Sequence, residues 1–229
     1  MKNKVQKNKL AKNNLRYSDQ KEYYLNHLKK QQKVKNNRFS ILGTHHKHLD
    51  KFIINSVKKL PDKSKLLDAG CGLSQWVNNS IRKKYIVSGV DGEPEAIEIC
   101  KILYSNQDYR LGNLYKLNYK DNEFDAIIMR EVIEHFKYPE KAVKEIYKIL
   151  KPGGLFILTT PNYNSPLTHL IEHTYNRFCG GACKPYKDGV HPSKFNPHTL
   201  KRLLEKYFTI HYLSTIDFGI SQTCICIKK

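Results

Sequence analysis

The sequence predicts an α/β protein with a mostly parallel sheet of seven strands and helices on both faces. From residue 65 onward, short apolar runs alternate with segments of helical spacing, which is the pattern of βαβ units. A turn with Gly70 and Gly72 directly follows the first apolar run, as is common where such a sheet meets a ligand. The last two apolar runs, 208–213 and 223–227, have no helix between them and are expected to form an antiparallel pair.

Two helices are expected before the sheet, an exposed one over 19–35 and an amphipathic one over 44–60. Pro94 and Pro139 each open a later helix, because the first turn of a helix does not use the missing N–H. Strands are expected from residue 65 to the glycine turn and over 85–90, 109–111, 124–129 and 155–159, and helices over 74–81, 94–104, 139–150 and 197–206.

Charge divides the chain into a basic leader and a more balanced body. The net charge is +19, and residues 1–65 hold 18 Lys and Arg against four acidic residues. We expect a flexible or helical leader over 1–40, one domain over 41–229, and a lid or insertion over about 162–197, where Gly, Pro and aromatic residues gather. Such a leader suits RNA or an anionic membrane surface through counterion release, and a solvated tail is the alternative.

Nothing in the sequence indicates export or membrane insertion. No apolar run reaches the length of a membrane span, and the N-terminus is rich in Lys and Asn, so a cytoplasmic protein is expected. Disulfides are not expected among the six cysteines in that setting. Cys179 and Cys183, with nearby histidines, match no strong zinc spacing.

Polar residues collect where the predicted strands end. These positions are Asp68 to Gly72, Asp91, Asn113 and the segment 130–135. The carboxyl ends of parallel strands share one edge, so these residues are expected to line one cleft. Asp91 stands 23 positions after Asp68, where an acid accepts the ribose hydroxyls of an adenine nucleoside, either in NAD or in S-adenosylmethionine.

Five motifs decide between these two cofactors. They are Leu-Leu-Asp-Ala-Gly-Cys-Gly at 66–72, Val-Asp at 90–91, Phe-Asp-Ala-Ile-Ile at 124–128, Glu-Val-Ile-Glu-His at 131–135 and Leu-Lys-Pro-Gly-Gly at 150–154. Together, over about 45–215, they resemble class I S-adenosylmethionine-dependent methyltransferases. The resemblance implies a Rossmann-like sheet, an enzyme, and S-adenosyl-L-methionine as the cofactor.

The resemblance also implies roles for individual residues. The glycine turn would receive the methionine part of the cofactor, the acid after the second strand the ribose, and the segment after the third strand the adenine. Two positions depart from the family pattern: Asn113 stands where Asp is usual, and Ser74 replaces a frequent third glycine. The cofactor-binding residues expected are Asp68, Gly70, Gly72, Asp91, Asn113, Leu114 and Arg130.

The segment Glu131-x-x-Glu134-His135 is the candidate catalytic site, because it follows the fourth strand directly. It resembles the ubiquinone-biosynthesis O-methyltransferases and the small-RNA 3′-terminal 2′-O-methyltransferases, in which two Glu and two His bind a divalent cation. His191 would be the second histidine, and Mg²⁺ or Mn²⁺ would lower the pKa of a coordinated hydroxyl. Alternatively, the two acids stabilise a helix N-terminus and His135 acts alone or only packs.

Methyl transfer to oxygen of a small or lipid-like acceptor is therefore the leading interpretation. The alternatives are an RNA methyltransferase that uses the basic leader and the cation site, a non-catalytic module that binds an adenosyl cofactor, and an NAD-dependent oxidoreductase. The missing third glycine disfavours the oxidoreductase.

Overall fold

The structure, a computed structural model, describes residues 41–175 and 191–229. The leader 1–40, with the helix expected at 19–35, and the middle of the expected lid, with Cys179 and Cys183, lie outside the described residues. In the part described, no helix combines the length and the apolar character that crossing a membrane requires.

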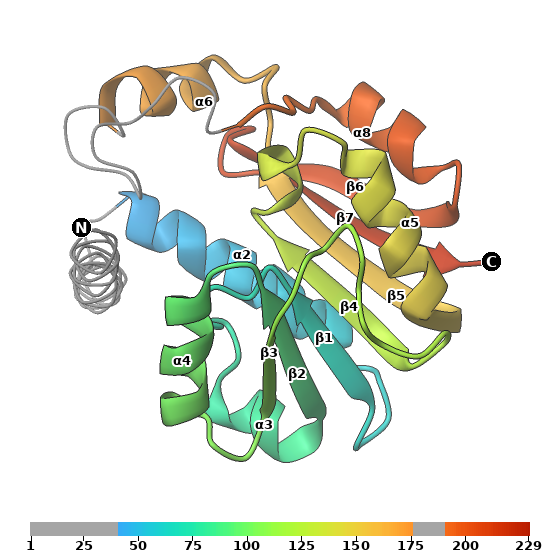
Figure 1. The fold of residues 1–229 in the computed structure, drawn as a ribbon. Helices are drawn as coiled ribbons and strands as arrows, with labels where there is room; N and C mark the ends of the chain where they lie inside the picture. The colour runs from blue at the N-terminus through green and yellow to red at the C-terminus, as the bar shows by residue number, and fades with distance from the viewer. Residues whose placement is uncertain (1–40, 176–190) are drawn as a thin grey trace, which may run out of the picture.

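A single sheet of seven strands runs through the described chain in the order β3-β2-β1-β4-β5-β7-β6 (Figure 1). Neighbouring strands from β3 to β5 are parallel, whereas β7 is antiparallel to both β5 and β6. This confirms the expected parallel sheet with its antiparallel C-terminal pair. The strands are β1 Lys65–Ala69, β2 Ile86–Asp91, β3 Asp108–Leu111, β4 Phe124–Arg130, β5 Leu150–Pro161, β6 Phe208–Ile216 and β7 Ser221–Lys228.

Helices cover both faces of the sheet, as expected. On one face Val143 and Ile146 of one helix and Leu200 of another join the larger apolar core, and on the other face Ile53 and Ile81 pack in a second core. Figure 1 shows α2 on the opposite side of the sheet from α5 and α8. The helices are α2 Ile41–Val57, α3 Asn79–Lys84, α4 Pro94–Leu103, η1 Ile133–His135, α5 Pro139–Ile149, α6 Pro166–Leu170, the π-helix η2 Ile171–Tyr175 and α8 Pro197–Leu204.

The helix expected at 74–81 starts later than predicted. Ser74 has a left-handed backbone with φ of 49°, so the chain turns there, and α3 begins only at Asn79. Asn78 caps α3 by accepting a hydrogen bond from the N–H of Ile81 at 3.0 Å. Trp76 is nevertheless buried, so this apolar residue packs into the core from a tight turn and not from a helix.

Strand β5 is longer than predicted at its start. Leu150 already pairs with Phe124, so the segment 151–154 lies inside the strand rather than between a helix and a strand. The register shifts between Phe124 and Ala126, where Gly153 takes a left-handed φ of 73°. The glycines therefore permit a bulge within β5. The sequence pattern had indicated only that they end the preceding helix.

Candidate active site

The glycine turn after β1 forms the floor of the candidate site. Gly70 and Gly72 both have positive φ, of 77° and 46°, which glycine adopts without strain. A Cβ on Gly70 would lie 2.6 Å from the Val132 side chain, whereas one on Gly72 would meet nothing within 4 Å. Gly70 therefore lets the turn pack against the segment after β4, and Gly72 keeps an open backbone surface for a ligand.

Asp68 lies in β1 and is buried below this turn. The Ser74 hydroxyl donates a short hydrogen bond to its carboxyl group. Burial raises the pKa of Asp68 to about 6, because desolvation outweighs the hydrogen bond and the positive charge of Arg130. Ser74, the residue in place of the third glycine, thus keeps the left-handed turn and adds a donor to the buried acid.

Asp91 ends β2 and joins the glycine turn to the start of α4. Its Oδ2 accepts from the N–H of Gly72 at 2.7 Å, and its Oδ1 accepts from the N–H of Glu93 at 3.0 Å. A carboxylate has about four acceptor sites, so two remain for a ligand such as a ribose diol. The predicted ribose-binding acid therefore also holds the turn in shape.

Asn113 follows β3 and is exposed beside the buried Leu114. Its side-chain Oδ1 accepts from the N–H of Tyr115 at 2.9 Å. The Nδ2 amide is then the group that Asn113 can offer to an adenine ring, as a donor. An Asp at this position would have only acceptors.

Arg130 connects the end of β4 to α2. Its Nε lies 3.0 Å from Oδ1 of Asp50, and its Nη2 lies 3.1 Å from Nδ1 of His46. Further along the same edge, Nδ1 of His45 lies 2.5 Å from Oδ2 of Asp217 in the β6–β7 turn. The N-terminal half of α2 is therefore fixed across the carboxyl ends of the strands. Sequence reasoning missed these α2 partners and expected only a cofactor contact for Arg130.

Glu131 has an unusual conformation for a glutamate. Its φ is 53°, in the left-handed region, which costs about 1–2 kcal/mol for a residue with a Cβ. Its N–H donates to the carbonyl of Thr159 at 3.0 Å, so pairing with β5 holds the backbone there. Its side-chain Oε1 is buried without a hydrogen-bond partner among the described residues. A left-handed backbone and an unpaired buried oxygen are features that often occur together at functional sites.

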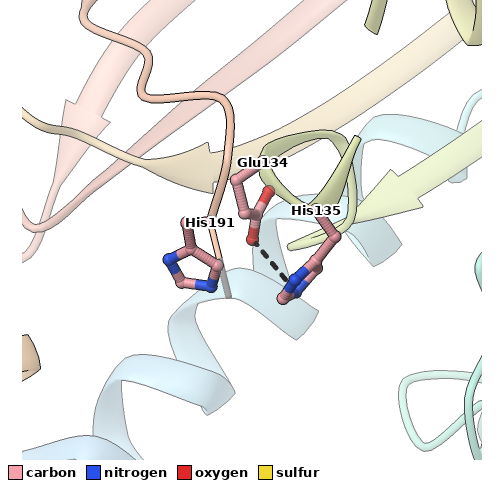
Figure 2. Close-up of side chains that lie close together, drawn as sticks. All are labelled: Glu134, His135 and His191. Atoms are coloured by element: carbon pink, nitrogen blue, oxygen red, sulfur yellow. Dashed lines mark ion pairs between the residues drawn. The ribbon is translucent and has the colours of Figure 1, made fainter. Parts of the chain in front are cut away.

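Three of the four predicted metal ligands come together. One ligand atom each from Glu134, His135 and His191 lies within 4.8 Å of the others, and Glu131 is not a member of this group. The rings of His135 and His191 meet edge to face, with centroids 4.7 Å apart. Figure 2 shows the three side chains converging, two of them from η1 and one from the chain before α8.

Glu134 and His135 differ sharply in environment. Glu134 is 1% exposed and accepts from the hydroxyl of Thr160 at 2.9 Å, whereas the His135 side chain is 45% exposed. Burial first, and then the negative charge of Glu131, raise the pKa of Glu134 well above its ordinary value. The His135 Nε2 lies 4.0 Å from Oε1 of Glu134. A cation bound between them would stabilise the ionised form of Glu134 against both its burial and the charge of Glu131.

His191 is supported from behind by two residues that sequence reasoning did not assign. Its Nδ1 lies 2.8 Å from Oε1 of Glu172 and 2.6 Å from the Tyr163 hydroxyl, which also donates to the same Glu172 oxygen. Burial acts to raise the pKa of Glu172, but the hydrogen bonds from His191 and Tyr163 lower it below its ordinary value. Tyr163 lies at the start of the segment expected as a lid or insertion.

The donor set fits a divalent cation and the turn fits an adenosyl cofactor. Two imidazoles and one carboxylate suit a transition-metal ion better than Mg²⁺, which prefers oxygen ligands. The buried unpaired oxygen of Glu131 adds negative charge nearby. For the cofactor, the open surface at Gly72 and the remaining acceptor sites of Asp91 provide backbone access and hydroxyl recognition side by side.

A parallel sheet with one antiparallel strand near its edge, and with a glycine turn and an acid at neighbouring strand ends, is the fold of class I S-adenosylmethionine-dependent methyltransferases. The family model described as a methyltransferase domain matches residues 44–208. The chain belongs to this family.

Curated relatives are similar to part of the chain. A probable S-adenosylmethionine-dependent methyltransferase of Mycolicibacterium smegmatis is 32% identical over 97 residues, which is 42% of this chain and 38% of that protein. The mitochondrial ubiquinone biosynthesis O-methyltransferase of Rattus norvegicus is 30% identical over 151 residues, which is 62% of this chain and 43% of that protein. The chain therefore spans less than half the length of these two relatives.

Solved structures share the fold over most of the chain. A TehB-like SAM-dependent methyltransferase of Corynebacterium glutamicum superposes with a TM-score of 0.64 at 15% identity, covering 93% of this chain and 100% of its own. A protein of Pyrococcus horikoshii gives a TM-score of 0.65 at 18% identity, covering 85% of this chain and 93% of its own. At these identities the likeness concerns the fold.

Proposed function

We propose that this protein is an S-adenosylmethionine-dependent methyltransferase that transfers the methyl group to oxygen of a small or lipid-like acceptor. The group formed by Glu134, His135 and His191 carries the proposal, because two of its members, Glu134 and His135, follow β4 directly in η1. Val132, between β4 and that group, packs on Gly70 of the turn. The residues proposed to activate the acceptor therefore lie close to the turn proposed to bind the cofactor.

The geometry of the turn supports the cofactor roles that the resemblance implies. S-adenosyl-L-methionine supplies an activated methyl group when it is bound. Asp91 would accept the ribose hydroxyls, Gly72 would present open backbone to the methionine part, and Asp68 would offer a buried acid below it. Asn113 and Leu114 would flank the adenine, one as a donor and one as an apolar surface.

The acceptor side requires a group that binds and deprotonates a hydroxyl. Glu134, His135 and His191 would hold Mn²⁺ or Mg²⁺, which lowers the pKa of a coordinated hydroxyl when it is bound. Glu131 would complete the site through its buried, unpaired oxygen after a change of rotamer. Without a cation, His135 is the exposed base that remains.

A small or lipid-like acceptor is supported by the relatives. The rat relative is named as a ubiquinone biosynthesis O-methyltransferase, and it is similar to 62% of this chain. We propose that residues 41–229 form the catalytic domain, with about 162–197 as a lid and residues 1–40 as a basic leader. We propose that the protein acts in the cytoplasm. The basic leader would add contact with an anionic membrane surface.

An RNA methyltransferase is the second candidate, because residues 1–65 carry 18 Lys and Arg against four acids. RNA binding would weaken steeply as salt rises, with a slope set by the number of phosphates contacted. A fluorescence titration with a short RNA at several salt concentrations therefore separates the two candidates. A non-catalytic module that binds an adenosyl cofactor is the candidate from another class.

The decisive experiment supplies methyl-labelled S-adenosylmethionine to the purified protein together with cell extract. A labelled, alkali-stable product that depends on the protein supports the enzyme, and its mass identifies the acceptor. Glu134→Gln and His135→Ala should abolish labelling while cofactor affinity by calorimetry stays within roughly twofold, because both residues are proposed to serve the acceptor and not the cofactor. Undiminished labelling in excess chelator would exclude the cation, and cofactor binding without any product would favour the non-catalytic module.

A further inference from the structure

The Nδ1 side of His191 is fully engaged by its neighbours. Glu172 reaches it from η2 with Oε1 at 2.8 Å, and the Tyr163 hydroxyl reaches it from the chain after β5 at 2.6 Å. Tyr163 also donates its hydroxyl proton to Glu172, so the three polar atoms form a closed triangle. Glu172 is buried, although it lies in a segment of chain with many exposed residues.

This triangle specifies where the proton of the neutral imidazole resides. An ionised carboxylate has no proton and can only accept. Glu172 already accepts from Tyr163, and it can take a bond from His191 only if Nδ1 carries the hydrogen. A neutral His191 then has its lone pair on Nε2.

The orientation of the ring places that lone pair toward the proposed cation site. Figure 2 shows one ring nitrogen of His191 turned toward His135 and Glu134 and the other turned away. Since Nδ1 is bound by Glu172 and Tyr163, the nitrogen that faces the site is Nε2. Histidines that bind metals usually donate their other N–H to a carboxylate, which fixes the tautomer and raises the basicity of the ligand.

We propose that Glu172, assisted by Tyr163, is a positioning residue that holds His191 in the Nδ1–H tautomer, with Nε2 presented to the site it shares with Glu134 and His135. The proposal rests on the proposed cation site and adds the device that orients one of its ligands. Glu172 and Tyr163 themselves contact neither the cation nor the acceptor.

Two measurements test the proposal on the full-length protein. The first is a long-range proton–nitrogen correlation spectrum of protein labelled with nitrogen-15 histidine, in which the signals of His191 among the ten histidines are identified by their loss in His191→Gln. The wild type should show the Nδ1–H tautomer for His191. Glu172→Gln should shift it toward the Nε2–H tautomer, because a glutamine amide can donate to Nδ1 as well as accept from it.

The second measurement is a titration with Mn²⁺ alone, followed by electron paramagnetic resonance of the free ion. Glu172→Gln should raise the apparent Kd roughly 10- to 100-fold, and Tyr163→Phe should raise it less. Glu205→Gln removes the same charge from an exposed pair with Lys201 on the helical surface and should leave the Kd unchanged. Circular dichroism of each variant confirms that the fold is retained.

The outcomes separate this proposal from the proposed function. If the wild type binds no Mn²⁺, or if His191→Ala does not weaken binding, the cation site fails while the tautomer still tests the positioning role. If Glu172→Gln leaves both the tautomer of His191 and the Kd for Mn²⁺ unchanged, Glu172 does not position His191 and the proposal is overturned.

Discussion

Ser74 donates its hydroxyl to the buried carboxyl group of Asp68 from a backbone that has a left-handed φ of 49°. Related turns often have a glycine here, which would adopt this backbone freely but would bring no donor. Compared with glycine, Ser74 therefore has a more strained backbone, but it gains a hydrogen bond to a buried acid. The two effects can be separated by substitution.

Ser74→Ala should destabilise the protein more than Ser74→Gly. Both variants lose the hydrogen bond to Asp68, which costs about 1–3 kcal/mol for a buried partner left unsatisfied. Only glycine relieves the left-handed backbone, which is worth about 1 kcal/mol here after its greater unfolded-state entropy is subtracted. Urea unfolding followed by the fluorescence of the single, buried Trp76 measures the difference. Equal stability of the two variants would show that the backbone at residue 74 is unstrained.

The acid at the other end of this bond should make stability depend on pH. The pKa of Asp68 is raised by burial from 3.8 to about 6, so the folded state holds the proton more tightly than the unfolded state. This contribution to stability is complete below pH 4 and is lost as the pH rises through 6, about 3 kcal/mol in all.

Asp68→Asn should remove this decline, because an amide does not titrate. The free energy of unfolding of the wild type should fall, relative to that of Asp68→Asn, between pH 4.5 and pH 7.5. Urea unfolding at several pH values gives both curves, and Asp108→Asn, at an exposed ion pair with Arg110, serves as the control. Curves of wild type and Asp68→Asn that stay parallel would contradict the shift.

Asp91→Ala should weaken cofactor binding in two ways. It removes the proposed acceptor for the ribose, and it takes away the partner of the Gly72 N–H, which shapes the turn. Loss of hydrogen bonds to a charged acceptor predicts roughly a 10- to 100-fold rise in the Kd for S-adenosylmethionine. Isothermal calorimetry measures this Kd directly. An affinity equal to that of the wild type would exclude Asp91 from the cofactor site.

The sheet and the grouping of polar residues at one edge of it could be predicted because their signals are local. The β-strands with their polar ends, such as Asp68 and Asp91, stand at regular spacing along the chain, and a parallel sheet brings those ends to one edge. The turn at Ser74 was assigned to a helix because apolar spacing alone does not distinguish a buried turn from a short helix.

The support of the site could not be predicted because it depends on contacts between distant segments. Glu172 meets His191 across 19 residues, and Arg130 meets His46 across 84. No periodicity links these positions, since neither pair lies in one element. The resemblance implied that Glu131 belongs to the same ligand set as Glu134, yet the group that the other three residues form does not include it.

Glu131 leads to the last prediction, that Glu131→Gln increases stability and decreases activity. Its Oε1 is buried without a hydrogen-bond partner in the part of the chain that the structure describes, and its charge opposes that of Glu134. Glutamine keeps the size of the side chain and removes this repulsion, so we expect unfolding to cost about 1 kcal/mol more. The same loss of charge removes the attraction for a cation and should lower the turnover at least tenfold. Urea unfolding and the methyl-transfer assay measure the two effects on one sample. A variant that is less stable and fully active would contradict the prediction. It would show that Glu131, with its left-handed φ of 53°, stabilises the fold and takes no part in the reaction.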